Sequence, residues 1–112
     1  MPSGGGNDVG GIGAAAVRKA ARIDNNQPAI VEALRQIGCT VHPTHMIGSG
    51  FPDIIAGYRG VNFLIEIKDG DKPPSKRRLT DDEERFHEDW RGQVATVEDV
   101  QGAIDLVVEA TI

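Results

Sequence analysis

Residues 52–68 have the sequence PDIIAGYRGVNFLIEIK, and this stretch decides the fold. Two apolar runs rich in β-branched residues flank the dipeptide Arg59-Gly60, which is the spacing of a β-hairpin with a two-residue turn. Counting outward from that turn places Asp53 directly opposite Glu66. Directly opposed residues share one face of a sheet, with Cβ atoms about 5 Å apart, so the hairpin is predicted to bring two carboxylates together.

The second strand of this hairpin adds another charged group to the same face. Glu66 and Lys68 are two residues apart and project from one face, whereas Ile67 points into the core. Two carboxylates this close repel each other and need a cation, and oxygen ligands suit Mg²⁺. We expect Asp53, Glu66 and the Ile67 backbone carbonyl to bind this metal. A metal-bound water, with Lys68 beside it, is the apparatus for phosphodiester hydrolysis.

The alternative is that Glu66 and Lys68 form an ordinary exposed pair, because Glu-x-Lys is common on strands. Here the pair follows Phe63-Leu64-Ile65, an apolar run in which an unpartnered charge is costly. The hairpin register, which places Asp53 opposite Glu66, is an independent observation in favour of a catalytic site. The sequence therefore favours a catalytic role for the set.

The segments before the hairpin are predicted to be a helix and a strand. The helix follows the candidate caps Asn25 and Asn26, has Pro28 in its first turn and ends at Gly38. Residues 39–45 are predicted to form a short strand before the hairpin.

The segments after the hairpin complete an α/β pattern. A second helix begins at Thr80, which forms a capping box with Glu83, and its inner face carries Phe86 and Trp90. A strand at residues 93–97 and an apolar helical stripe beyond it end the chain. The predicted order is helix, three strands, helix, strand, helix: an α/β sandwich, αβββαβα, around a small mixed sheet flanked by helices.

The 112 residues suffice for one domain and not for two. We assign residues 1–23 to a flexible glycine-rich tail and residues 24–112 to the folded domain. The chain has neither an apolar run of about 18 residues nor an apolar secretory signal, so we expect no membrane association. The single cysteine, Cys39, cannot form an internal disulfide, which favours a reducing, intracellular setting.

The formal net charge of −5 argues at first against a nucleic-acid partner, but the charge is unevenly distributed. Residues 1–80 carry 10 Lys/Arg and 7 Asp/Glu, whereas residues 81–112 carry 2 and 10. The basic residues gather in two clusters: Arg18, Lys19 and Arg22, and Lys72, Lys76, Arg77 and Arg78. Basic loops are often only solvated. The second cluster follows Lys68 directly, so we expect it, with Ser75, to bind phosphates beside the active site.

The chain resembles the VRR-NUC family (virus-type replication-repair nucleases) of the PD-(D/E)xK nuclease superfamily, and looks most like its short, stand-alone phage and bacterial members. The matching segments are residues 24–31, 34–35, 50–53, 66–70, 73–75, 79–80, 86–87 and 90. They cover most of the chain from Asp24 to Trp90. The resemblance implies a restriction-endonuclease-like core of the αβββαβα order. It also implies a Mg²⁺-dependent nuclease, with Mn²⁺ as a substitute, that leaves a 5′-phosphate.

The resemblance also implies roles for residues and a set of partners. It places the metal ligands at Asp53 and Glu66 and the family's lysine at Lys68. Many relatives have a further glutamate early in the first helix, where this chain has Gln27. They often have Gln or Glu at the position of Glu83 or its neighbour. We keep Gln27 and Glu83 as accessory candidates, although Glu83 is also explained by its capping box. The implied substrate is DNA, branched or flapped. A relation to Holliday-junction resolvases implies a homodimer, and the phage or bacterial relatives imply the host cell's cytoplasm.

The remaining candidates have simpler explanations. His42 and His45 suggest zinc, but no cysteine or histidine pair completes such a site, so we favour contact with solvent or substrate. We expect His87 to pack on a helix surface and Cys39 to be a small buried hydrophobe. Phe86 and Trp90 are predicted to belong to the core rather than to a stacking platform.

Two classes of function compete. The first is a structure-selective DNA endonuclease of the repair, recombination or replication type. The second is a DNA-binding subunit that has the fold but does not cut. The complete set of two carboxylates and a lysine favours the enzyme. A nuclease acting on RNA stays open, because no residue selects DNA.

Overall fold

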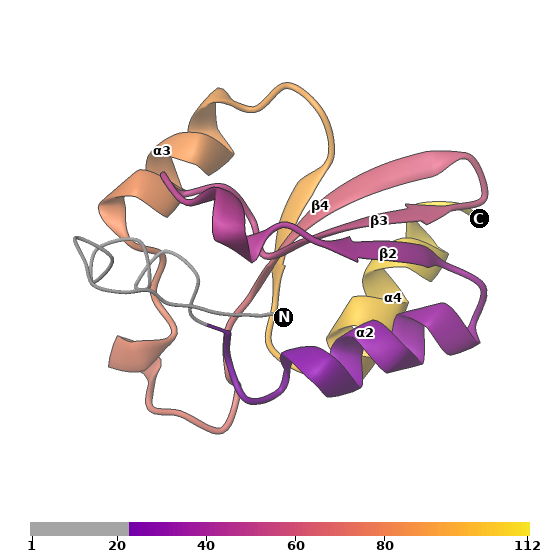
Figure 1. The fold of residues 1–112 in the computed structure, drawn as a ribbon, viewed down its shortest axis with the longest axis horizontal. Coiled ribbons are helices and arrows are strands. Elements are labelled where there is room, and N and C mark those ends of the chain that lie inside the picture. The colour runs from indigo at the N-terminus through magenta and orange to yellow at the C-terminus, as the bar shows by residue number, and fades with distance from the viewer. Residues whose placement is uncertain (1–22) are drawn as a thin grey trace, which may run out of the picture.

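The β3–β4 hairpin forms the centre of the structure, a computed structural model that describes residues 23–112 (Figure 1). β3 spans Ile54–Tyr58 and β4 spans Val61–Ile67. The strands pair antiparallel from Tyr58↔Val61 to Ile54↔Ile65, which confirms the predicted register. Arg59 and Gly60 have φ angles of 51° and 83°, as a type I′ hairpin turn requires. The predicted tail lies outside the described residues apart from Ile23, and so do the basic residues Arg18, Lys19 and Arg22.

The hairpin belongs to a mixed four-stranded sheet of order β2-β3-β4-β5. β2 (Thr40–Pro43) pairs antiparallel with β3, and β5 (Val94–Val97) pairs parallel with β4. A parallel pair needs a long crossover connection, and the segment that contains α3 supplies it. The predicted order αβββαβα and the small mixed sheet are confirmed.

Helices α2 (Gln27–Gln36) and α4 (Val100–Glu109) lie side by side and pack against one face of the sheet (Figure 1). The buried residues that meet there include Ile30, Leu34, Ile54, Ala56, Phe63, Ile65, Ile67, Ala103 and Val107. Because side chains alternate between faces, this core orients Leu64 and Glu66 to the opposite face. The packing of the core therefore decides where the charged face of β4 lies.

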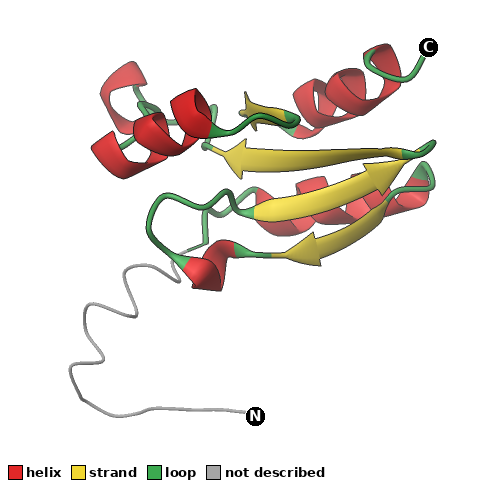
Figure 2. Cartoon of the chain, turned by 90° about the horizontal axis from the view of Figure 1, so that it is seen from above, coloured by secondary structure: helices red, strands yellow, loops and turns green. Residues whose placement is uncertain are grey.

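Helix α3 (Asp81–Asp89) stands at the end of the sheet remote from the hairpin turn (Figures 1 and 2). It begins with the predicted capping box, in which Thr80 Oγ1 accepts from the Glu83 N–H and Glu83 Oε1 accepts from the Thr80 N–H. Two short 3₁₀ helices, η1 (His45–Ile47) and η2 (Pro74–Lys76), lie in the loops. No helix of residues 23–112 has the combination of length and apolar character that crossing a bilayer demands.

The strand predicted at residues 39–45 is shorter than expected. It ends at Pro43, which has no N–H to donate to a further rung of the ladder. The chain then turns back toward the hairpin, because the Thr44 N–H donates to the Asp53 carbonyl at 2.7 Å and Thr44 Oγ1 to the Pro52 carbonyl at 2.8 Å. Thr44 thereby anchors the residues just before β3.

The prediction that Phe86 and Trp90 belong to the core was wrong. α3 has no buried residue, and the Trp90 side chain is 43% exposed. The reason is the position of α3, which covers only the end of the sheet. Its aromatic side chains instead pack on one another and on Phe51.

Gly50 is the point where the loop before β3 touches the first turn of α3. Its φ is 81°, and a Cβ there would overlap the backbone carbonyl of Asp82. Gly60 also has a positive φ, 83°, but a Cβ at that position meets nothing within 4 Å. Substitutions at these two glycines therefore distinguish the cost of backbone strain, which both would have, from the cost of steric overlap, which only Gly50 would have.

We predict that Gly50→Ala destabilises the protein by roughly 3 kcal/mol, through strain plus overpacking. Gly60→Ala, the matched control, should cost only the strain of about 1 kcal/mol. Urea denaturation of the two variants measures both values. Equal losses would mean that the loop can move away from α3 at little cost.

Candidate active site

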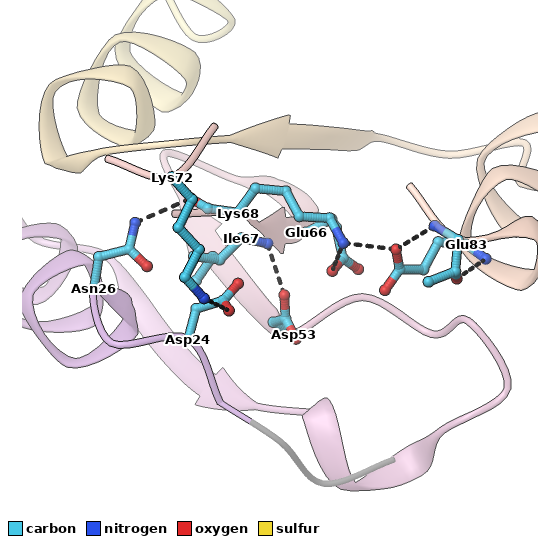
Figure 3. Close-up of polar contacts among 9 residues, drawn as sticks. Asp24, Asn26, Asp53, Glu66, Ile67, Lys68, Lys72 and Glu83 are labelled. Carbon is cyan, nitrogen blue, oxygen red and sulfur yellow. Dashed lines mark hydrogen bonds and ion pairs between the residues drawn. The ribbon is translucent and has the colours of Figure 1, made fainter. Parts of the chain in front are cut away.

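Asp53 and Glu66 are held together by the backbone of the hairpin. The Asp53 N–H donates to the Ile65 carbonyl at 3.0 Å, and Asp53 Oδ2 accepts from the Ile67 N–H at 2.7 Å (Figure 3). The Asp53 side chain is thus fixed beside β4 one residue before β3 begins. Glu66 is buried, at 3% exposure, on the face opposite the core. The structure brings the two predicted carboxylates together.

Lys68 completes the cluster and connects it to α3. Its Nζ lies 2.8 Å from Glu83 Oε1 and 3.7 Å from Glu66 Oε2 (Figure 3). The same Glu83 oxygen accepts from the Thr80 N–H at 2.9 Å. Glu83 is therefore both the capping-box acid and the ion-pair partner of Lys68. The sequence identified the first role, but the second depends on where α3 is placed in three dimensions.

Burial and like charge dominate the electrostatics of the carboxylate pair. Burial and, after it, the neighbouring Asp53 charge raise the pKa of Glu66 to about 10. Burial also raises the pKa of Asp53, partly offset by the hydrogen bond from Ile67. Glu66 Oε1 is buried with no hydrogen-bond partner. Without a cation, this site therefore holds a proton at neutral pH.

For Lys68 and Glu83, the contact between the two groups outweighs the effect of burial on the pKa. Burial alone would lower the pKa of Lys68, but the hydrogen bond and charge of Glu83 raise it above the ordinary value. Burial alone would raise the pKa of Glu83, and the contact with Lys68 lowers it. Both groups are therefore charged at neutral pH, and Lys68 stays a cation next to the carboxylates.

A cavity of about 350 Å³ opens over these groups. Its lining includes Asp53, Glu66, Lys68, Glu83, Phe51 and His45. Asp24 and Asp82 are also at its wall. The cavity gives a small polar ligand access to the buried carboxylates.

The donor set suits a hard divalent cation. Asp53 and Glu66 supply carboxylate oxygens, and Glu66 Oε1 has no competing partner. The Ile67 N–H points to Asp53. Because the N–H and C=O of one strand residue point to the same side of the strand, the Ile67 carbonyl also points to the side of β4 on which Asp53 lies. Within residues 23–112, no three His, Cys, Asp or Glu side chains gather around one point. Two carboxylates and a carbonyl leave room for several waters, as Mg²⁺ prefers.

Gln27, an accessory candidate, is not brought to this cluster. It is 4% exposed and lines a separate cavity of about 550 Å³ beside α2. Glu32 is exposed on α2. His45 touches both cavities, whereas His42 is exposed on β2, so the two histidines do not form a joint site.

Asn26 has a role that the sequence did not reveal. It occupies the N-cap position of α2, but its side chain makes no capping hydrogen bond. Its Nδ2 instead donates to the carbonyls of Lys68 and Glu98, both at 3.0 Å. It therefore ties α2 to the ends of β4 and β5, directly behind the lysine. A sequence signal for a helix cap cannot distinguish these two uses of one asparagine.

The basic loop after β4 contains two kinds of cation. Arg77 is half-buried: its Nε donates to the Lys72 carbonyl at 2.8 Å, and its guanidinium lies 3.1 Å from a Glu98 carboxylate oxygen. Lys72 Nζ lies 4.0 Å from Asp24 Oδ1, and Asp24 is at the wall of the cavity over the carboxylates. The loop also presents exposed side chains, those of Ser75, Lys76 and Arg78. Arg77 holds the loop in place, and the exposed residues are free to bind anions.

No protein-family model matches this chain, and the search of curated proteins finds no match. Among solved structures, a chain described as "VRR_NUC domain" is similar to it. The two are 23% identical, the alignment covers 84% of this chain and 92% of the other, and the TM-score is 0.45. That description names the family which the motifs of the sequence resemble.

The raised pKa of Glu66 predicts a pH-dependent stability. In the unfolded chain Glu66 ionises near its ordinary pKa of 4.5, whereas the folded protein without metal keeps the proton up to about pH 10. The folded state then binds more protons than the unfolded state in this window, so its stability falls as pH rises.

We predict that Glu66→Gln, in the presence of EDTA, is more stable than the original protein by more than about 1 kcal/mol near pH 8. The difference should shrink toward about pH 5. Urea denaturation across this range measures it, with Glu32→Gln, an exposed carboxylate, as the control. Parallel curves for all three proteins would show that Glu66 is not protonated in the fold.

Proposed function

We propose that this chain is a metal-dependent nuclease of the VRR-NUC type that hydrolyses phosphodiester bonds in DNA. The observation that carries the proposal is Glu66, a buried carboxylate with one unpartnered oxygen, held against Asp53 and within reach of a lysine. The resemblance of the motifs to that family supports it. Mg²⁺, with Mn²⁺ as its substitute, is the proposed cofactor.

Each residue of the cluster has a distinct task in this proposal. Asp53, Glu66 and the Ile67 carbonyl would hold the cation, which when bound supplies a more acidic water and neutralises charge on the phosphate. Lys68 orients the attacking water or offsets the negative charge that develops on the phosphate. Glu83 is a positioning residue in this proposal, because its carboxylate holds Lys68 Nζ at 2.8 Å.

The alternative is a DNA-binding subunit that does not cut. Such a module has no use for a buried Glu66 whose pKa is raised by burial and by the neighbouring charge of Asp53. Burial of an unpartnered carboxylate costs stability and is expected to be retained only where it serves chemistry. Cleavage of a substrate panel (single-stranded, flapped, splayed and four-way-junction DNA), with and without Mg²⁺, decides between the two and identifies the preferred structure.

We predict that Asp53→Ala and Lys68→Ala each lower the rate of DNA cleavage at least a hundredfold, since the first removes a proposed ligand of the cation and the second removes the ammonium that acts on the water or the phosphate. Both should still unfold cooperatively, because the side chains lie on the charged face and not in the core. His42→Ala, exposed on β2, is the control and should cleave at the original rate.

Calorimetric titration with Mn²⁺ separates the ligands from the lysine. Affinity should fall in Asp53→Ala and in Glu66→Gln, but not in Lys68→Ala. An unchanged affinity in Glu66→Gln would remove Glu66 from the ligand set. Loss of cooperative unfolding in Asp53→Ala or Lys68→Ala would mean that the residue is structural.

We predict that Lys76→Ala with Arg78→Ala weakens DNA binding and reduces the slope of log affinity against log salt by about 0.9 for each lost phosphate contact. Arg77→Ala should instead lower stability, by about 1–3 kcal/mol, because its guanidinium bonds hold the loop. Fluorescence anisotropy over a range of salt concentrations measures the slope. If the double variant keeps both affinity and slope, the loop is only solvated.

We also propose a homodimer as the working unit. The folded part is small, and a single protomer offers only a limited basic surface and one metal site. An isologous twofold contact would place two sites on one DNA molecule. Light scattering at micromolar concentration is expected to give twice the 12.0 kDa of the chain. A monomer mass, with and without DNA, would exclude the dimer.

A further inference from the structure

The three aromatic rings at the end of the sheet form a ladder that starts at the catalytic cavity. Phe51 lines that cavity. Its ring lies edge-on to Phe86, with centroids 5.1 Å apart, and Phe86 stacks on Trp90 at 5.2 Å with an interplanar angle of 17°. The ladder therefore leads from the wall of the catalytic cavity, at Phe51, to Trp90 in two ring contacts.

Trp90 is the last ring of the ladder and is partly open to solvent. Phe86 stacks on the indole, and Trp90 is still 43% exposed. Gly92 lies close to the indole nitrogen, because a Cβ on that residue would come within 2.8 Å of Trp90 Nε1. The indole therefore packs on Phe86 and also offers an apolar surface to solvent.

The surroundings of Trp90 are suited to a base and not to a phosphate. An adjoining cavity of about 230 Å³ is lined by Trp90, Phe86, Asp82, Arg85, Asp89 and Ser49. Ser49 and Asp82 also line the catalytic cavity, so the two cavities are neighbours. Two carboxylates repel a phosphate but can accept hydrogen bonds from the amino groups of a base. Arg85 lies 3.1 Å from Asp82 and adds a donor.

We propose that Trp90 is a stacking platform for an unpaired nucleobase of the substrate strand. A base within a duplex already has neighbours on both faces, so only an unpaired base can offer a free face to the indole. The ladder connects the wall of the catalytic cavity to Trp90, so the stacked base belongs to the strand that enters this cavity. This inference rests on the proposed nuclease function and specifies its substrate: DNA with an unpaired base near the cleaved phosphate.

The fluorescence of Trp90 provides a direct test, because it is the single tryptophan of the chain. The full-length protein is titrated in EDTA with an oligothymidylate, with the same oligomer lacking its bases, and with a duplex of equal length. We expect quenching by the oligothymidylate and little change with the abasic strand or the duplex. Equal quenching by the abasic strand, or no quenching by any strand, overturns the proposal.

Variants test whether the ring itself binds. Trp90→Ala should weaken binding of the oligothymidylate about tenfold, as loss of one base–aromatic stack does, and Trp90→Phe should restore most of the affinity. Ile47→Ala, which removes an apolar side chain of similar exposure (56%), is the matched control and should bind normally. Equal affinities for Trp90→Ala and the original protein overturn the proposal.

Two further outcomes identify other occupants. A shift of Trp90 fluorescence with protein concentration alone would mean that a second copy covers the ring, and this overturns the proposal. Failure of the nuclease proposal looks different: no substrate is cleaved in Mg²⁺, while quenching by unpaired bases persists. If DNA is cleaved but Trp90→Ala cuts a flap and a plain duplex in the original ratio, the nuclease stands and the stacking platform is rejected.

Discussion

The forced proximity of Asp53 and Glu66 is the constraint on which the rest of the structure depends. A type I′ turn fixes the hairpin register, and the backbone N–H of Ile67 clamps the Asp53 carboxylate beside β4. The fold thereby keeps two acids together at the floor of a cavity, where Glu66 is buried and Asp53 is partly buried. Such a pair is unfavourable by itself, as the raised pKa of Glu66 shows. A protein that maintains it needs a compensating charge nearby.

The surrounding elements supply and position that compensation. Lys68 continues the charged face of β4, and Glu83 fixes its ammonium from the first turn of α3. Asn26 ties α2 to the carbonyl of the same lysine, and Gly50 allows the loop before β3 to press against α3. Elements that are distant in the sequence thus meet around one short strand end. The site is the place where the layers of the fold are joined.

The arrangement of the site explains why acidic and basic residues are separated along the chain. The acidic first turn of α3 stabilises the helix N-terminus and, through Glu83, the ammonium of Lys68. On the proposed function, the exposed cations of the loop before α3 would meet phosphates, and the acidic, aromatic surface beyond the cavity would meet bases. A net negative charge is then compatible with a nucleic-acid partner, because the groups of opposite sign lie on different surfaces.

The sequence by itself determined the hairpin, its register, the order of elements and the cluster of Asp53, Glu66 and Lys68. These features are local: a two-residue turn and the twofold alternation of a strand place side chains without reference to the rest of the chain. Only the tertiary structure decided that Glu83 reaches Lys68, that Asn26 bridges two strands instead of capping its helix, and that Gln27 lies away from the carboxylates. It also decided that Phe86 and Trp90 remain outside the core. Their helical spacing described an apolar face correctly, but whether such a face is buried depends on what lies opposite. α3 projects past the end of the sheet, where no other helix or strand of residues 23–112 covers it.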